Sequence, residues 1–163
     1  MALVEWNSEY SVGILSIDLQ HQKLFEMINE LYSALREGNV AQVVPAILKR
    51  LETYCREHFT HEENMMLRAE YPDYSRHKHE HAKLMERALT LGNDFNESRV
   101  VRSLTLLTLL KEWTQRHILS CDKQYSAHLI AAGITDISES PACVAPTSIF
   151  KAAALTSQYV RTH

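Results

Sequence analysis

The chain has 163 residues, 45% of them hydrophobic, and a formal net charge of −3. This length suits one compact domain, and without a lysine and arginine block or a basic face interleaved with aromatics we expect no nucleic-acid partner. Four glycines and four prolines leave little material for the turns of an all-β protein, whereas apolar residues recur at helical spacings of three and four, which predicts an all-α fold.

The first helix is preceded by an arm. Residues 6–17 mix large apolar side chains with Gly13 and show no clean period, so we expect them to lie over the bundle. The helix is predicted to begin with Asp18 as its N-cap and to end at Gly38, because acidic N-caps and C-terminal glycines satisfy free backbone groups. His21 lies on its apolar stripe.

Three further helices are predicted, over residues 40–68, 74–95 and 97–131. The Tyr71-Pro72 corner separates the first two of these, and Gly133 ends the last. Short connections make neighbouring helices antiparallel, so the prediction is an antiparallel, up-down four-helix bundle. The residues expected to face inward on the last helix are Val100, Leu104, Leu107, Leu110, Trp113 and Ile118.

The bundle is predicted to occupy residues 1–133, and residues 134–163 to form a C-terminal extension whose role the sequence does not reveal. Within the extension, residues 148–159 are alanine-rich and suit a short helix. Because the first residues show no basic region before an apolar stretch, and no run of about 18 apolar residues occurs, we expect a cytoplasmic protein without membrane insertion. Among the three cysteines, Cys55 and Cys121 are expected to be small buried hydrophobes.

Nine histidines are more than a helical protein of this size requires, and most of them fall at helical spacings. His58 with Glu62, and His77 with His81, stand four residues apart, so each pair lies on one helical face about 6 Å apart. Each pair can therefore converge on one ion or on neighbouring ions.

His117 and Asp122 form a weaker pair, because a spacing of five leaves them roughly 140° apart around a regular helix. Two arrangements would bring them to one site. They can flank a centrally placed metal pair from either side, or a π-bulge can rotate the last turn. The sequence does not choose between these two arrangements.

Seven ionisable groups on inward faces would each cost several kcal/mol if they were buried without partners. Divalent cations remove this cost by turning the groups into ligands. Imidazole and carboxylate without thiolate suit iron, and carboxylate sites in bundle cores are normally dinuclear. The predicted metal ligands are His21, His58, Glu62, His77, His81, His117 and Asp122.

The order and spacing of these seven residues, with Trp6, Ile17-Asp18, Phe59, Tyr71-Pro72 and Trp113 around them, resemble the hemerythrin family over residues 1–131. The resemblance implies two non-haem irons joined by an oxo or hydroxo group and by the carboxylates of Glu62 and Asp122. It also implies that His77, His81 and His117 bind one iron, and His21 and His58 the other.

The same resemblance implies reversible dioxygen binding, in a pocket lined at positions occupied here by Phe59, Trp113 and Ile118. Thr114 departs from the family, which commonly has leucine three residues before the last ligand histidine. Its hydroxyl would admit water or donate a hydrogen bond, and we expect it to speed autoxidation. We expect an oxygen carrier, store or delivery protein rather than an enzyme, with an unidentified protein as the recipient of oxygen.

Two other functions stay open on the sequence alone. One is a di-iron oxidase or peroxidase, which Thr114 slightly favours but the five ligand histidines disfavour, because such oxidases use mainly glutamate. The other is a module that senses oxygen or iron. Tyr125 is equally suited to donating a hydrogen bond to a metal ligand and to closing the apolar core. His61 and His79 are expected to be solvated. The residues excluded as ligands are His128, His163, Met65, Met66 and Met85.

Overall fold

The computed structural model describes residues 2–93 and 99–135, and every regular element in these ranges is helical. The predicted all-α fold is confirmed. Three predictions lie outside the described residues. They are the end of the third helix at Phe95, the start of the fourth at Glu97 and the extension beyond residue 135. The elements are α1 (Leu15–Glu37), α2 (Val40–Arg68), α3 (Tyr74–Asn93), α4 (Arg99–Glu112), η1 (Trp113–Asp122) and α5 (Lys123–Ala131).

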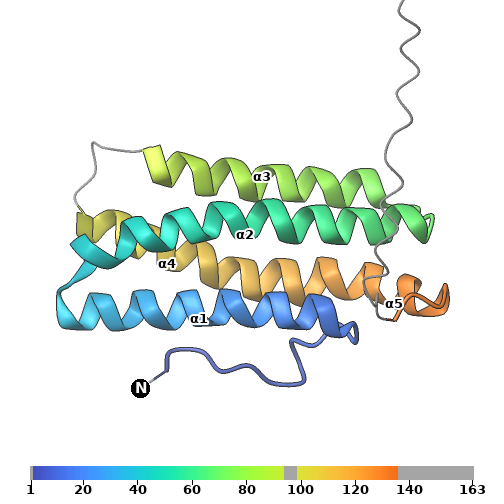
Figure 1. Cartoon of the computed structure of the whole chain (residues 1–163), viewed down its shortest axis with the longest axis horizontal. Coiled ribbons are helices and arrows are strands. Elements are labelled where there is room, and N and C mark those ends of the chain that lie inside the picture. The colour runs from blue at the N-terminus through green and yellow to red at the C-terminus, as the bar shows by residue number, and fades with distance from the viewer. Residues whose placement is uncertain (1, 94–98, 136–163) are drawn as a thin grey trace, which may run out of the picture.

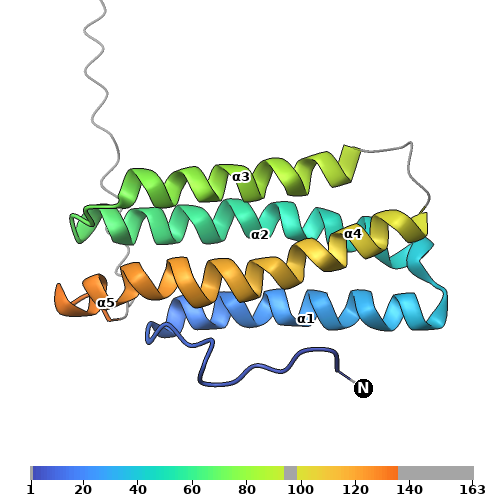
Figure 2. The same cartoon turned by 180° about the vertical axis from the view of Figure 1, so that it is seen from behind.

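The four long helical rods lie side by side in an antiparallel bundle (Figure 1). α1 contacts α2 and α4, and α3 contacts the same two helices from the other side. η1 and α5 continue the rod that α4 begins, and the N-terminal arm runs along the outside of α1 (Figure 2). No helix among the described residues is both long and apolar enough to cross a membrane.

α1 begins one turn earlier than the sequence predicted. Its N-cap is Ile14, and Asp18 lies buried inside the first turn. The Asp18 carboxylate accepts hydrogen bonds from the Ser11 hydroxyl (2.5 Å) and from the backbone N–H of Val12 (2.8 Å). Asp18 therefore does not cap the helix. Its carboxylate instead binds residues of the N-terminal arm to α1.

The two short connections follow the predicted turn chemistry. Gly38 ends α1 with φ +73°, a left-handed conformation in which its N–H bonds to the carbonyl oxygen of Ala34. α2 runs to Arg68, and the N–H of Tyr71 then bonds to the Met66 carbonyl before α3 begins at Tyr74. These tight turns keep successive helices antiparallel and adjacent.

The predicted inward face of α4 is partly wrong. Leu110 is buried as predicted, but Val100 and Leu104 are 55% and 52% exposed. Ser103, Leu106 and Leu109, which were not predicted to face inward, are buried. Leucines occupy several faces of this helix, so more than one stripe fits the pattern, and the true stripe includes a serine. Apolar spacing alone could not select the buried face here.

The bundle core is divided into two apolar clusters that lie on either side of a polar layer. One cluster extends from Leu24 on α1 to Ile118 on η1, and the other contains Ile17, Met65 and Tyr125. α1 changes from one cluster to the other at His21, α2 changes at Glu62, and the rod formed by α4, η1 and α5 changes at Asp122. The fold thus places ionisable groups where apolar contacts would otherwise be continuous.

Candidate metal centre

All seven predicted ligands lie in this polar layer, and each side chain is at most 5% exposed. They form two groups in which potential ligand atoms lie within 4.8 Å of one another. The first group is Glu62, His77, His81 and His117, and the second is His21, His58, Glu62 and Asp122. The structure therefore contains two adjacent groups that share Glu62, and each could hold a metal ion.

The two carboxylate oxygens of Glu62 face different histidines. Oε1 lies 3.3 Å from His58 Nε2 and 3.7 Å from His21 Nε2. Oε2 lies 3.0 Å from His81 Nε2 and 3.5 Å from His77 Nε2. One carboxylate thus offers an oxygen atom to each site, which is the arrangement of a bridging ligand.

Asp122 is divided between the sites in the same way. Its Oδ2 lies 3.3 Å from His21 Nε2, whereas its Oδ1 lies 3.2 Å from His117 Nε2 and 3.5 Å from His77 Nε2. Both carboxylates therefore span the boundary between a group of three histidines and a group of two.

A π-helix brings Asp122 to the site. Residues 113–122 form η1, in which each N–H bonds five residues back rather than four. Residues five apart then lie on one face, so His117 and Asp122 both point into the polar layer. Of the two arrangements left open by the sequence, the structure has the π-helix.

Buried polar atoms in the cluster lack partners, which is rare in native cores. The atoms without a hydrogen-bond partner in residues 2–93 and 99–135 include His21 Nδ1 and Nε2, His58 Nε2, Glu62 Oε2, His117 Nε2 and both carboxylate oxygens of Asp122. The remaining two histidines, His77 and His81, point their Nε2 atoms at each other at 2.9 Å. Lone pairs that converge in this way fit cations, and a set of imidazoles and carboxylates fits iron.

The charges of the cluster are strongly coupled. Burial opposes protonation of His21, but Asp122 and Glu62 outweigh it and raise its pKa to about 9. Burial lowers the pKa of His58 well below its usual value, and neighbouring imidazoles add to the effect. For Glu62, burial is outweighed by His58 and the other imidazoles, so its pKa falls well below the ordinary range. The carboxylate form of Glu62 is therefore favoured, which is the form that binds metal.

Three hydrogen bonds orient the ligands from behind. Gln20 Oε1 accepts the Nδ1–H of His58 at 2.9 Å, and Glu63 Oε1 accepts the Nδ1–H of His81 at 3.1 Å. Each bond leaves the Nε2 lone pair facing the cluster. Tyr125 is fully buried and donates its hydroxyl to Glu62 Oε1 at 2.6 Å, so the open question about this residue is answered in favour of a bond to a ligand.

Apolar side chains close the cluster on the side predicted for the pocket. Phe59 stacks on His81 with ring centroids 3.9 Å apart and on Trp113 at 5.3 Å, and Ile118 is fully buried. Thr114 is also buried, and its hydroxyl donates to the Lys111 carbonyl at 2.9 Å. That hydroxyl is therefore used within its own helix, which leaves the wall of the cluster apolar.

Several other predictions about single residues are also decided. His79 is exposed, but His61 is only half exposed and bonds to the Ser16 hydroxyl at 3.0 Å, so it is not simply solvated. His128 contacts the Ala69 carbonyl at 2.8 Å, away from the cluster. Cys121 is half-buried rather than buried. Gln20 and Glu63 were not predicted, because their partners lie on other helices and no spacing within one helix signals them.

These features define a four-helix bundle whose core contains a cluster of histidines and carboxylates that could hold metal. Residues 12–129 match the profile of the hemerythrin HHE cation binding domain. A bacteriohemerythrin of Stenotrophomonas maltophilia is 32% identical over 136 residues, covering 79% of this chain and 86% of that protein. A bacteriohemerythrin of Methylococcus capsulatus is 30% identical over 132 residues, covering 80% of this chain and all of that protein. The chain belongs to the hemerythrin family.

A solved structure supports the same conclusion at the level of the fold. The crystal structure of a hemerythrin mutant superposes with a TM-score of 0.67 at 30% sequence identity. The match covers 79% of this chain and 98% of that one. Because almost all of that hemerythrin is matched, the matched part of this chain corresponds to a whole hemerythrin, and about a fifth of this chain lies outside the match.

Proposed function

We propose that the chain binds dioxygen reversibly at a centre of two iron ions. His77, His81 and His117 would hold one iron, and His21 and His58 the other. Glu62 and Asp122 would bridge the two, together with an oxo or hydroxo group. When bound, the iron pair supplies the site for dioxygen and the electrons that its reversible binding requires.

The observation that carries this proposal is the unequal division of ligands. Three histidines serve one site and two serve the other, while each carboxylate points one oxygen at each group. A site with fewer protein ligands keeps a position open for a small molecule. The chain's own contribution is to hold this geometry and to exclude water from it with Phe59, Trp113 and Ile118.

Carriage, storage or delivery of oxygen fits this site better than turnover. Five imidazoles and two carboxylates form a less anionic shell than the glutamate-rich sites of di-iron oxidases. The Thr114 hydroxyl, which slightly favoured an oxidase or peroxidase, already donates to its own helix. We therefore propose that the protein is not an enzyme and that it acts in the cytoplasm, with an unidentified protein as recipient of the oxygen.

A sensing role is the remaining rival, since oxygenation of a bundle can alter its contacts with a partner. The discriminating experiment begins with iron-loaded protein reduced with dithionite under argon, then exposed to air and returned to argon. A visible absorption band that appears in air and disappears under argon supports a carrier. Irreversible oxidation with steady consumption of added hydrogen peroxide supports an oxidase or peroxidase. A band that cycles together with a change in oligomeric state supports a sensor.

A further inference from the structure

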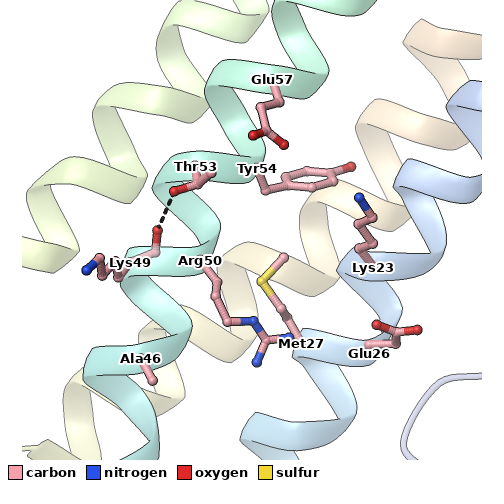
Figure 3. A pocket seen from close by; sticks show the side chains of 9 residues that line it. All are labelled: Lys23, Glu26, Met27, Ala46, Lys49, Arg50, Thr53, Tyr54 and Glu57. Atoms are coloured by element: carbon pink, nitrogen blue, oxygen red, sulfur yellow. Dashed lines mark hydrogen bonds between the residues drawn. The ribbon is translucent and has the colours of Figure 1, made fainter.

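A pocket of about 540 Å³ lies between α1 and α2, on the outside of the bundle core. Figure 3 shows its side chains, which come from these two helices only. The residues that line it are Lys23, Glu26, Met27, Ala46, Lys49, Arg50, Thr53, Tyr54 and Glu57. Its volume is in the range of small-molecule sites, and none of these residues belongs to the metal cluster.

The base of this pocket contains a hydrogen-bond donor without a partner. Tyr54 is 6% exposed, and its buried hydroxyl has no hydrogen-bond partner among the described residues. In Figure 3 its ring reaches from α2 toward Lys23 on α1, across the space that Met27 bounds below. Burial and the nearby carboxylates of Glu62 and Asp122 raise the pKa of Tyr54 well above its usual value, so the phenol keeps its proton. An unpaired buried hydroxyl is costly, and a ligand oxygen would satisfy it.

Tyr54 also joins the pocket to the candidate metal centre. Its ring stacks on that of His58, with centroids 4.9 Å apart and planes 22° apart. His58 in turn points its Nε2 at Glu62 Oε1. A molecule against Tyr54 is therefore separated from a metal ligand by a single aromatic ring.

The same ring makes the pocket unsuitable as a path for dioxygen. Tyr54 lies over His58 and closes the base, and the volume is far larger than a diatomic molecule needs. The lining combines an apolar floor with basic groups at Lys23, Lys49 and Arg50 and acidic groups at Glu26 and Glu57. Arg50 forms an ion pair with Glu30, which lies outside the pocket, so two basic and two acidic groups remain. Since these charges balance, a neutral planar molecule with oxygen acceptors fits better than an anion or a cation.

We propose that this pocket binds a small hydroquinone, which reduces the oxidised metal centre through Tyr54 and His58. This inference rests on the proposed function, because an oxygen carrier that autoxidises needs a source of electrons. The hydroquinone would lose two electrons and two protons and leave as the quinone. The electrons return two Fe(III) ions to Fe(II), and the protons pass to water at the mouth of the pocket, where Glu57 is exposed.

Binding is tested with menadione, a small quinone, added to the purified full-length protein and measured by calorimetry. Tyr54→Phe removes the donor and should weaken binding about fivefold. Ala46→Trp fills the pocket from an exposed position and should weaken it at least about tenfold. Ala82→Trp makes the same change on an exposed position of α3 and should leave binding unaltered. If menadione does not bind the wild type, or if both tryptophan variants lose affinity equally, the proposal that menadione binds in this pocket is wrong.

Electron delivery is tested by mixing the oxidised, iron-loaded protein with menadiol and following loss of its visible absorption. Ala46→Trp should slow the reaction about tenfold, while Ala82→Trp should not change it and dithionite should reduce all variants alike. Equal menadiol rates in both tryptophan variants would refute the electron route. If menadione binds in the pocket but the visible absorption band does not appear in air and disappear under argon, the proposed function fails and the ligand site stands. If the band cycles without menadione binding, only this inference fails.

Discussion

At the scale of single residues, the hydrogen bonds behind the ligands decide how firmly the cluster is held. Tyr125 bonds to Glu62, Gln20 to His58 and Glu63 to His81. Such partners fix which imidazole nitrogen faces the metal and keep a carboxylate from rotating. Removing one of them should weaken metal binding while the fold survives.

Tyr125→Phe tests this most cleanly, because it deletes one hydroxyl from a fully buried ring. We expect iron affinity to fall about 10- to 100-fold. Competition with a chelator of known affinity measures the change. Tyr32→Phe, on α1 three turns from His21, is the matched control and should bind iron as the wild type does. Unchanged affinity in Tyr125→Phe would show that the bond does not support the cluster.

Thr114→Leu restores the residue that the family commonly has before the last ligand histidine. The larger apolar side chain would add packing at a buried position next to Trp113 in the chain, so we expect slower autoxidation of the oxygenated protein. The lifetime of the oxygenated absorption band at fixed temperature is the measurement. Thr114→Val, which keeps the shape but lacks the hydroxyl, separates polarity from size. A lifetime equal to that of the wild type in both variants would contradict the expectation.

Four of the seven predicted ligands stand in i, i+4 pairs that can be read directly from the sequence, whereas His21 stands alone and His117 and Asp122 are five residues apart. The hydrogen-bond partners Gln20 and Glu63 could not be predicted, since each reaches a histidine on a different helix. Tyr54 was missed for the same reason, because only the packed bundle brings its ring against His58 and leaves its hydroxyl unpaired. Local spacing reports faces of single helices, whereas these roles arise between helices or from packing.

At the scale of elements, the fourth rod departs from α-helical geometry at η1, where it supplies His117 and Asp122 to the cluster. An α-helix would place Asp122 to one side of His117, and the π-helix turns both onto one face. The sequence showed the mismatch as a spacing of five but gave two solutions. On α4 the prediction of the buried face was partly wrong, since Val100 and Leu104 fitted one apolar stripe whereas the buried residues include Leu106 and Leu109.

The turn at Gly38 gives an element-scale prediction about stability. Its φ of +73° disfavours any side chain, although an added Cβ would meet no atom within 4 Å. Gly38→Ala should therefore lower the free energy of unfolding by about 1 kcal/mol, measured by urea denaturation. Gly92→Ala is the control, because this glycine lies inside α3 with open space around it and should gain about 0.5–1 kcal/mol. A loss of equal size in both variants would contradict the backbone explanation.

At the scale of the whole molecule, the polar layer divides two apolar clusters, and the proposed metal ions would join them. Glu62 and Asp122 are fully buried carboxylates from different helices, and His21 contacts both. Ions bound at this level would link all four rods of the bundle. Metal content should therefore control global stability more than any single surface interaction does.

Removal of iron with a chelator, verified by elemental analysis, should lower the midpoint of thermal unfolding. Free metal at about 1,000 times its Kd contributes about 4 kcal/mol, which corresponds to roughly 8–16 °C for a domain of this size. Circular dichroism follows the transition, and helical content at low temperature should change little because both apolar clusters remain. A midpoint that does not move after complete removal would mean that the cluster does not bind the helices together through metal.

The central claim is that two irons in this bundle bind dioxygen and release it unchanged. Oxygen uptake by the reduced, iron-loaded protein, followed by recovery of the gas on deoxygenation, tests this directly. We expect uptake of about one dioxygen for every two irons, with nearly all of it recovered as dioxygen. Uptake without recovery, accompanied by peroxide or water, would contradict it and identify an oxidase instead.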